Sequence, residues 1–227
     1  MRYAIFSDLH DNRAALQAVI DDAAAHAAGH LLYLGDVGSD PRLFAALRER
    51  SIPCTFGNWE VIGLRRMARE QAEWVGGWPA TLSAGRALCA HATPDLPATV
   101  SDTRGAYSFM MTAGGVNGLF PRLHLDEDAL WQAFARLEVE GVQIFFHGHT
   151  HVQMAFQWNS DGGKGEPLRQ ITAPGVLRLE PSPAVRYVIG VGSAGQPMDG
   201  RQGRYVLYDD TAQVVILRRL GDPVVAG

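Results

Sequence analysis

The stretch YAIFSDLHDN, residues 3–12, decides the fold class of this 227-residue chain. Its first four residues are apolar, as expected for a strand that is buried on both faces. A polar loop, residues 7–12, follows this strand, and Asn12 is a favourable N-cap for a helix expected over residues 13–28. Strand, loop and helix in this order begin a βαβ unit, in which helices cover a parallel sheet.

The same pattern recurs in the residues that follow. A second apolar strand is expected over residues 31–34. The pair Asp40-Pro41 indicates the N-cap and first residue of a helix that runs to about Arg50. A third strand is expected over residues 52–56. We therefore predict an α/β fold for this part of the chain.

The rest of the chain is less regular and richer in strands. Helices are expected over residues 60–74 and 126–139, and a hairpin should join strands at 81–82 and 87–90 around Ser83-Ala84-Gly85. Residues 94–121 have no regular pattern. Further strands, separated by turn residues, are expected at 142–146, 152–158, 170–173, 185–190, 204–208 and 214–217.

The composition is that of an ordinary globular protein, with 47% hydrophobic and 19% charged residues. A net charge of −4 argues against binding duplex nucleic acid through a broad basic surface. The apolar runs are too short for a membrane span, and the N-terminal strand does not resemble a signal peptide. Cys54 and Cys89 are expected to be buried in strands rather than disulfide-bonded. We predict one cytoplasmic domain over residues 1–227.

Short polar side chains follow each of the first three predicted strands. Asp8 and His10 follow the first strand, and in extended chain they would point to the same side. Gly35-Asp36 follows the second strand and Gly57-Asn58 the third, where each glycine should permit a sharp turn. Because ligands collect at the carboxyl ends of strands in open α/β sheets, these side chains are candidate metal ligands. Loop capping is the competing explanation for Asp36 or Asn58 taken singly.

Histidines follow two later apolar strands. His91 ends the run 87–90, and FFHGHTH, residues 145–151, carries three histidines. His149 and His151 would share a side in extended chain, and such a cluster after a buried strand indicates a metal site. A solvated histidine-rich loop, the alternative, fits poorly beside so apolar a strand. His147 is a candidate acid or base, but the glycine after it is expected to turn its side chain away.

The ordered motifs Asp-x-His, Gly-Asp, Gly-Asn, His and Gly-His-x-His resemble those of the calcineurin-like metallophosphoesterase superfamily. They extend from residue 7 to 151, and residues 191–197 and 204–209 resemble the closing segment of its small prokaryotic members. The resemblance implies a two-sheet β-sandwich flanked by helices, with a dinuclear metal site at the carboxyl ends of strands. It implies one metal held by Asp8, His10, Asp36 and His151, and a second held by Asp36, Asn58, His91 and His149, with Asp36 as the bridge.

This resemblance implies a metal-dependent phosphoric ester hydrolase. Mixed oxygen and nitrogen ligands suit manganese, iron or zinc better than magnesium or calcium, and manganese is the first candidate. Two metals about 4 Å apart can activate a shared water and direct it at phosphorus, so that no protein nucleophile is required. Asp36, Asn58 and His91 are assigned as catalytic residues in addition to their ligand role.

The third motif departs from the common pattern of the superfamily. Many relatives carry Gly-Asn-His, whereas this chain has Gly57-Asn58-Trp59-Glu60. That histidine is usually assigned to protonate the leaving oxygen, and indole N–H has no useful acidity near neutral pH. We therefore expect a preference for leaving groups that need little protonation, such as aryl or nucleotide phosphates. Trp59 could stack on a substrate ring or simply pack, and Asn12 could contact substrate or simply cap its helix.

The predicted function is hydrolysis of phosphodiester or phosphomonoester bonds of a small, nucleotide-type substrate by a metal-activated water. Dinucleoside polyphosphates are one specific option. A protein phosphatase is disfavoured because residues 35–41 lack the Asp-Arg pair of Gly-Asp-x-x-Asp-Arg-Gly. A catalytically silent scaffold that binds a protein partner is disfavoured because all seven ligands are present.

No stable nucleic-acid binding is expected, and the oligomeric state is left open, with a homodimer as one option. Some arginines could bind substrate phosphate or be plain solvated charges; these are Arg13, Arg65, Arg66 and Arg104.

Overall fold

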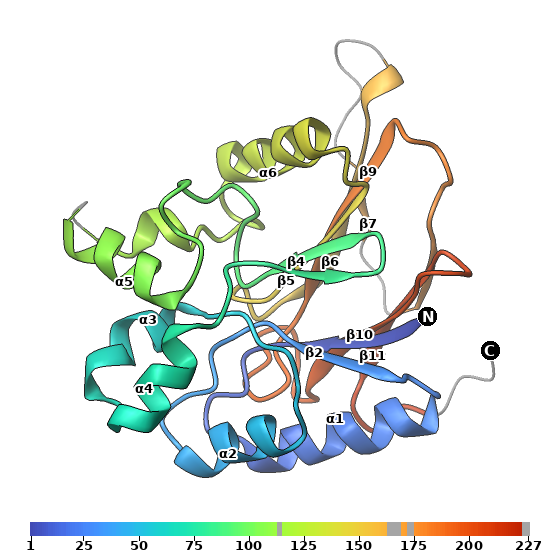
Figure 1. Cartoon of the computed structure of the whole chain (residues 1–227). Coiled ribbons are helices and arrows are strands. Elements are labelled where there is room, and N and C mark those ends of the chain that lie inside the picture. Colours follow the sequence, from blue (N-terminus) through green and yellow to red (C-terminus); the bar gives the residue numbers. More distant parts are fainter. Residues whose placement is uncertain (113–114, 163–168, 172–174, 224–227) are drawn as a thin grey trace.

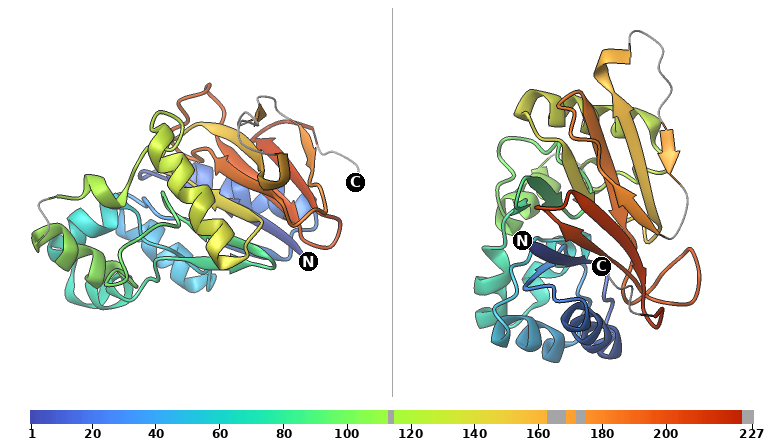
Figure 2. Two further views of the ribbon diagram at one scale, coloured as in Figure 1. Left: turned by 90° about the horizontal axis from the view of Figure 1, so that it is seen from above. Right: turned by 90° about the vertical axis from the view of Figure 1, so that its right-hand side faces the viewer.

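The computed structural model of the chain describes residues 1–112, 115–162, 169–171 and 175–223. In these residues two β-sheets pack face to face, and helices cover their outer faces (Figures 1 and 2). The first sheet has the order β2 (His30–Tyr33), β1 (Arg2–Phe6), β10 (Arg204–Asp209), β11 (Val214–Arg219) and β8 (Val176–Arg178). The second has the order β3 (Leu82–Ala84), β4 (Ala87–Ala90), β5 (Ile144–His147), β9 (Val185–Val191), β6 (Gln153–Asn159) and β7 (Arg169–Ile171).

The helices form two layers and one cluster at the end of the sandwich. In Figure 1, α1 and α2 lie along the first sheet, α6 lies along the second, and α3, α4 and α5 gather at one end. None of the helices in the described ranges is long and apolar enough to cross a membrane. Their bounds are α1 (Arg13–Ala25), α2 (Pro41–Glu49), α3 (Asn58–Gly63), α4 (Arg69–Gly76), α5 (Thr103–Thr112) and α6 (Glu127–Glu140), with short 3₁₀ turns η1 (Leu64–Arg66), η2 (Asn117–Leu119) and η3 (Ser160–Gly162).

The continuous apolar runs of the central strands are explained by burial on both faces. In β1, Ile5 packs between the two sheets, whereas Ala4 and Phe6 pack against the helices. In β5, Phe146 packs between the sheets and Phe145 packs under α6. Side chains of adjacent residues point to opposite faces of a strand, so both faces need apolar side chains here. The predicted two-sheet α/β sandwich is confirmed.

The predicted helix starts are confirmed by their caps. The Asn12 side chain accepts a hydrogen bond from the backbone N–H of Ala15 at 3.0 Å and so caps α1. Asp40 accepts from the backbone N–H of Arg42 at 2.9 Å, with proline as the first residue of α2. These oxygens pair with N–H groups that lack a partner inside the helix.

The predicted strand over residues 52–56 is wrong. Only Cys54 bridges the sheet, opposite Tyr33 and parallel to it. Pro53 has no N–H and cannot donate to a ladder, which explains why the pairing does not extend. Both cysteines of the chain are buried, as predicted.

Other boundaries also differ from the prediction. The helix expected over residues 60–74 is divided into α3, η1 and α4, because Met67 adopts an extended backbone at φ −72° and ψ 151°. The β3–β4 turn lies at Gly85 and Arg86, one residue later than expected. Helix α5 and strand β8 were not predicted. Of the strand expected over 170–173, residues 172 and 173 lie outside the described residues.

Candidate metal centre

The loops that follow β1, β2, β4 and β5 meet at one edge of the sandwich. Backbone hydrogen bonds join them in pairs: Asp8 N–H donates to Gly35 O at 3.0 Å, and Gly148 N–H donates to His91 O at 2.9 Å. A later loop closes against the first one, where Gly195 N–H donates to Asp8 O at 3.0 Å. The carboxyl ends of the strands, where a ligand site was predicted, are therefore held together by main-chain contacts between segments far apart in the sequence.

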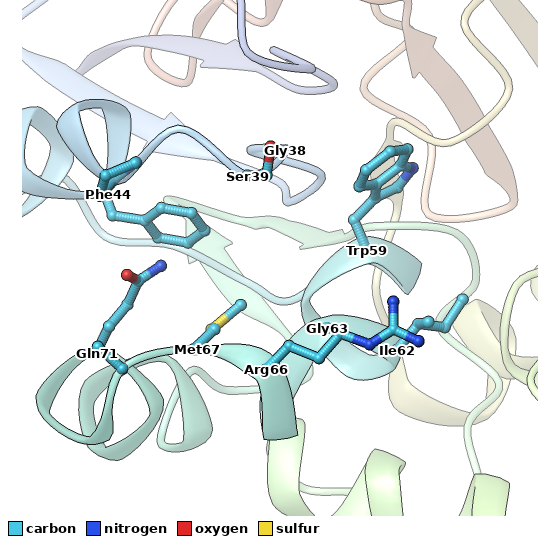
Figure 3. Close-up of a pocket in the computed structure, with 11 residues that line it drawn as sticks. Gly38, Ser39, Phe44, Trp59, Ile62, Gly63, Arg66, Met67 and Gln71 are labelled. Atoms are coloured by element: carbon cyan, nitrogen blue, oxygen red, sulfur yellow. The ribbon is translucent and has the colours of Figure 1, made fainter.

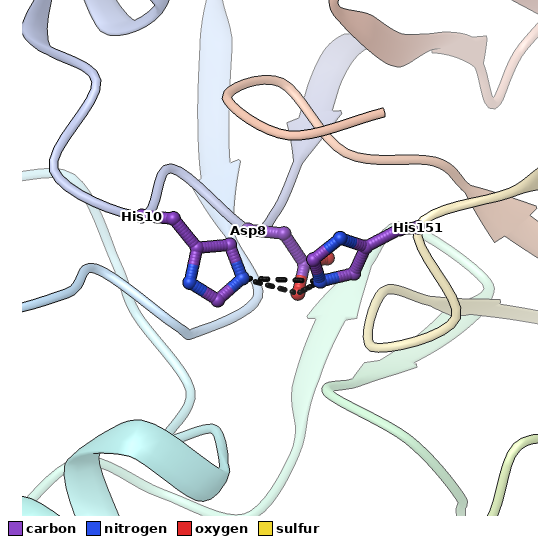
Figure 4. Close-up of side chains that lie close together, drawn as sticks. All are labelled: Asp8, His10 and His151. Carbon is purple, nitrogen blue, oxygen red and sulfur yellow. Dashed lines mark hydrogen bonds and ion pairs between the residues drawn. The ribbon is translucent and has the colours of Figure 1, made fainter. Parts of the chain in front are cut away.

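Asp8, His10 and His151 form the first group of possible metal ligands. One ligand atom from each lies within 4.8 Å of the others. The Nε2 atoms of His10 and His151 face each other at 3.0 Å, and both rings point at the carboxylate of Asp8 (Figure 4). Asp8 Oδ1 lies 3.3 Å from His151 Nε2 and is buried without a hydrogen-bond partner among the described residues. A buried, unpaired carboxylate oxygen between two ring nitrogens fits a bound cation.

Asp36, His91 and His149 form the second group, also within 4.8 Å of one another. Asp36 Oδ2 lies 3.6 Å from His91 Nε2. Asn58 joins this group, because its side-chain oxygen lies 3.3 Å from the same ring nitrogen. The two groups correspond to the two ligand sets that the sequence motifs imply.

The carboxylate of Asp36 lies between the groups. Its Oδ2 is 3.8 Å from His10 Nε2 in the first group and 3.6 Å from His91 Nε2 in the second. Its other oxygen, Oδ1, accepts the backbone N–H of Trp59 at 2.9 Å. One oxygen is therefore fixed by the fold, and the other faces both groups, which is the position that a bridging ligand needs.

Backbone carbonyls orient two of the histidine rings. His91 Nδ1 lies 2.7 Å from Leu34 O, and His151 Nδ1 lies 2.8 Å from Gln196 O. A carbonyl oxygen only accepts, so Nδ1 carries the hydrogen and the Nε2 lone pair is directed at the site. Metal-ligating histidines are commonly oriented in this way.

Burial lowers the pKa of three of the four histidines in the two groups. Loss of solvation lowers the pKa of His149 to about 3, and it also lowers the pKa of His91 and of His10 below the ordinary value. His151 differs, since the neighbouring Asp8 raises its pKa despite burial. Metal binding requires neutral imidazole, so a depressed pKa leaves the ring nitrogens available near neutral pH.

The pKa values of the two buried carboxylates, Asp8 and Asp36, are shifted in opposite directions. Burial alone would raise the pKa of Asp8, but the combined effect of the surrounding histidines is larger and lowers it to about 2. Burial, together with the negative charge of Asp8, raises the pKa of Asp36 well above its ordinary value. Two carboxylates in one buried site repel each other, and cations between them would offset that repulsion.

Five of the seven proposed ligand residues adopt left-handed backbone conformations. The φ angles are 57° at Asp8, 44° at His10, 63° at Asp36, 61° at His149 and 58° at His151. Asp8 and His10 lie in one ligand group, as expected, but left-handed turns and not extended chain bring them together. The expectation that His149 and His151 share a side is wrong. The tight turns instead place His149 and His151 in different groups.

The two glycines of the second and third motifs have different roles. Gly35 has φ +100° and permits the sharp turn that was predicted. Gly57 has φ −112° and ψ −174°, an extended conformation, so the predicted turn is wrong there. A side chain at Gly57 would instead collide with Asp36 Oδ1 and approach His91 Cε1 to 2.8 Å. Gly57 is needed because two ligands pass close to its backbone.

Glu60 is a positioning residue that the sequence interpretation missed. Its carboxylate is fully buried and accepts three backbone N–H groups, from Asp36 at 2.9 Å, Val37 at 2.8 Å and Gly57 at 2.7 Å. Burial, followed by the charge of Asp36, raises the pKa of Glu60 to about 7. The carboxylate ties the second motif to the third. A glutamate three residues after Gly57, at a helix start, was the available sign.

Asn12 and His147 occupy places that the fold explains. Asn12 caps α1 with its oxygen and donates its amide to Gly195 O at 3.3 Å, so both ends have partners. Its substrate role stays a prediction. His147 is buried outside both ligand groups, with Nδ1 3.0 Å from Gly148 O.

Three of the four candidate arginines have structural partners. Arg13 Nε lies 3.6 Å from Asp40, Arg65 lies over the Tyr107 ring at 5.2 Å, and Arg104 donates to Glu73 O at 2.8 Å. Arg66 lines a cavity beside Trp59.

The chain belongs to the calcineurin-like phosphoesterase superfamily, whose domain model matches residues 1–212. Membership supports a metal-dependent phosphoesterase. A metallophosphoesterase from Sphaerobacter thermophilus is similar in structure, with a TM-score of 0.68 and 22% identity over 98% of this chain and 90% of that one. Yfce, a phosphoesterase from E. coli, has a TM-score of 0.46 and 14% identity over 97% and 100%. The first likeness shows the shared fold. No curated protein matches the sequence.

Proposed function

We propose that this chain hydrolyses phosphoester bonds, phosphodiesters above all, of a small nucleotide-type substrate with the help of two transition-metal ions. The observation that carries the proposal is the position of Asp36 Oδ2, 3.8 Å from His10 Nε2 and 3.6 Å from His91 Nε2. A carboxylate oxygen that faces two separate ligand groups is suited to bridge two ions. Dinuclear sites of this kind favour in-line displacement at phosphorus.

The ligand assignment follows from the two groups. Asp8, His10 and His151 would hold one ion. Asp36 would bind both this ion and the second one. Neutral imidazoles and carboxylate oxygens form a donor set that suits manganese first, with iron or zinc as alternatives. When bound, the ions supply the Lewis acidity that activates a water and offsets charge on the phosphoryl oxygens. Asn58, His91 and His149 complete the second set.

The residues of the chain have separate tasks in this proposal. Asp36, Asn58 and His91 are the proposed catalytic residues, because Asn58 and His91 would hold the second metal ion and Asp36 would hold both ions at the reacting phosphate. Trp59, at 47% exposure, has its ring edge-on to His10 with 5.5 Å between centroids. Its indole N–H cannot protonate a leaving oxygen, so we propose that aryl and nucleotide leaving groups react fastest.

The proposal is tested by restoring metals to the metal-stripped protein. Mn²⁺, Fe²⁺, Zn²⁺ and Mg²⁺ are added singly, and turnover is measured on phosphomonoesters, phosphodiesters and dinucleoside polyphosphates. We expect turnover of aryl or nucleotide diesters with at least one transition metal and little with Mg²⁺. Stoichiometric metal binding without turnover of any ester would contradict the proposal and favour a non-catalytic scaffold.

A further inference from the structure

A cavity of about 730 Å³ opens beside the proposed metal centre. Its walls come from the loop after β2, from α2, and from the segment that runs from α3 to α4. Apolar side chains form most of the lining, among them Phe44, Trp59, Ile62 and Met67 (Figure 3). Cavities of this size with mostly apolar walls and a few polar groups commonly bind small organic molecules.

Trp59 is shared between the cavity and the metal centre. Its indole lines the cavity, while its ring edge contacts His10 and its backbone N–H holds Asp36. Ile62 is one helical turn further along α3, and at 46% it is about as exposed as Trp59 at 47%. A substrate whose phosphate lies at the metal centre would therefore have its organic part next to an exposed indole.

Arg66 lines the same cavity and adds a positive charge that is unpaired among the described residues. In the part of the chain that the structure describes, its guanidinium has no hydrogen bond, ion pair or ring contact. Nearby arginines do have partners, since Arg48 pairs with Glu70 at 2.8 Å and Arg65 lies over Tyr107. Figure 3 shows Arg66 on the same side of the cavity as Trp59, with Gln71 further along. A guanidinium and an amide can donate hydrogen bonds to the acceptor edge of a planar ring.

We propose that this cavity binds the nucleobase of a nucleotide ester. The base would stack on Trp59 and accept hydrogen bonds from Arg66, while the scissile phosphate lies at the metal centre. The inference rests on the proposed phosphoesterase function and adds the place where the base of the nucleotide would bind. An indole face combined with an unpaired guanidinium favours a flat ring with acceptor atoms over a purely aliphatic group.

Gly63 offers a way to fill the cavity without touching the proposed ligands. It lines the cavity, and a Cβ built on it would meet only the Met67 methyl, at 3.8 Å, among the described residues. Gly63→Leu should therefore fold and occupy the space. Gly29 is exposed, lies outside the cavity lining and has no described atom within 4 Å of its built Cβ. Gly29→Leu is the matched control.

The experiment compares two diesters that share one leaving group, thymidine 5′-(4-nitrophenyl phosphate) and methyl 4-nitrophenyl phosphate. Because the leaving group is the same, the ratio of their kcat/KM values isolates the contribution of the nucleoside. We expect this ratio to fall about tenfold in Gly63→Leu and to keep its wild-type value in Gly29→Leu. Arg66→Gln should lower the ratio as well. An unchanged ratio in both Gly63→Leu and Arg66→Gln overturns the inference.

A binding measurement separates this inference from the proposed function. Thymidine 5′-monophosphate is titrated into metal-stripped wild type, Gly63→Leu and Gly29→Leu by calorimetry. Weaker binding in Gly63→Leu alone supports the cavity as a base site even if no ester is hydrolysed, a result that would remove only the enzymatic proposal. Equal affinity in the three proteins overturns the cavity assignment even if esters are hydrolysed.

Discussion

Trp59 holds Asp36 through its main chain: the backbone N–H donates to Asp36 Oδ1 at 2.9 Å, while the indole extends toward His10. The residue at which this sequence departs from the common superfamily motif therefore has two separable functions. Its backbone positions the proposed bridging carboxylate, and any residue except proline can do that. Its side chain is free to set the chemistry of the leaving group and of the cavity.

The first prediction concerns that side chain. Trp59→His should raise kcat for an alkyl phosphodiester relative to an aryl one, because imidazole can protonate the leaving oxygen. General acid catalysis contributes on the order of 10²-fold or more, and a residue not optimised for it should give about tenfold. Steady-state kinetics on matched alkyl and aryl esters measures the ratio.

Trp59→Ala is the control for this substitution, since it removes the indole and adds no acid. It should keep the wild-type preference for aryl leaving groups. If the wild-type protein already hydrolyses alkyl and aryl esters equally well, the leaving-group hypothesis fails.

The second prediction concerns metal stoichiometry. His149→Ala and His151→Ala should each retain about one of two ions, because the two rings lie in different ligand groups. Asp36→Asn should weaken both sites, since its Oδ2 faces both groups. Elemental analysis of dialysed protein provides the count, and kcat/KM should fall at least about 10²-fold in each variant. Two tightly bound ions in Asp36→Asn would contradict the bridging role.

The third prediction concerns the buried carboxylate of Glu60. Glu60→Gln should lower the free energy of unfolding by about 2–4 kcal/mol, because the amide cannot accept all three N–H groups and loses the charge that strengthens them. Metal affinity should fall as well, since Asp36 and Gly57 lose their common anchor. Urea unfolding and metal titration measure the two effects.

Glu70→Gln is the matched surface control. The Glu70 side chain is 80% exposed, and its one ion pair among the described residues is the solvated pair with Arg48. Its effect on unfolding should stay within about 0.5 kcal/mol. Similar destabilisation by the two substitutions would show that Glu60 does not anchor the motifs.

The fourth prediction concerns pH and a carboxylate outside the proposed metal centre. Asp210 accepts hydrogen bonds from Tyr208 Oη at 2.9 Å and from Arg86 N at 3.3 Å, at the β3–β4 turn. Burial alone would raise the pKa of Asp210, but the combined effect of these partners is larger and opposite. The pKa in the folded state therefore lies below the ordinary value. Its stabilising effect is therefore complete above the unfolded pKa of about 4 and is lost as the pH falls through the folded value.

Asp210→Asn should accordingly reduce stability by about 1 kcal/mol at neutral pH. The difference from wild type should shrink in acid as the wild-type carboxyl protonates. Chemical unfolding at several pH values tests this, with the exposed Asp95→Asn as a control. A difference that grows in acid would reverse the assigned sign.

The sequence was sufficient to predict the parts of the fold that depend on local pattern. Apolar runs predicted β1, β2 and β5, and the caps Asn12 and Asp40 predicted where α1 and α2 begin. The order of strands within each sheet was not predictable, because register and neighbours depend on contacts between segments far apart. Helix α5 was missed for the same reason. Its burial comes from packing of Ala106 and its neighbours in the large helical core.

The candidate site was predictable as a set of residues and not as a geometry. Ligand types at strand ends indicated which side chains converge. The left-handed turns at His10 and His151 have no sign in the sequence beyond the tolerance of histidine and aspartate for that conformation. The sequence also gave no indication that the backbone carbonyl of Gln196 orients the His151 ring.

The left-handed backbone at five of the ligand residues, with φ between 44° and 63°, has a consequence for how the protein evolves. Each such residue costs about 1 kcal/mol relative to ordinary backbone, a cost that glycine or asparagine would largely avoid. A chain free of any need for ions would drift toward those residues. This one keeps aspartate and histidine at all five positions and so gives up stability that its fold could have had.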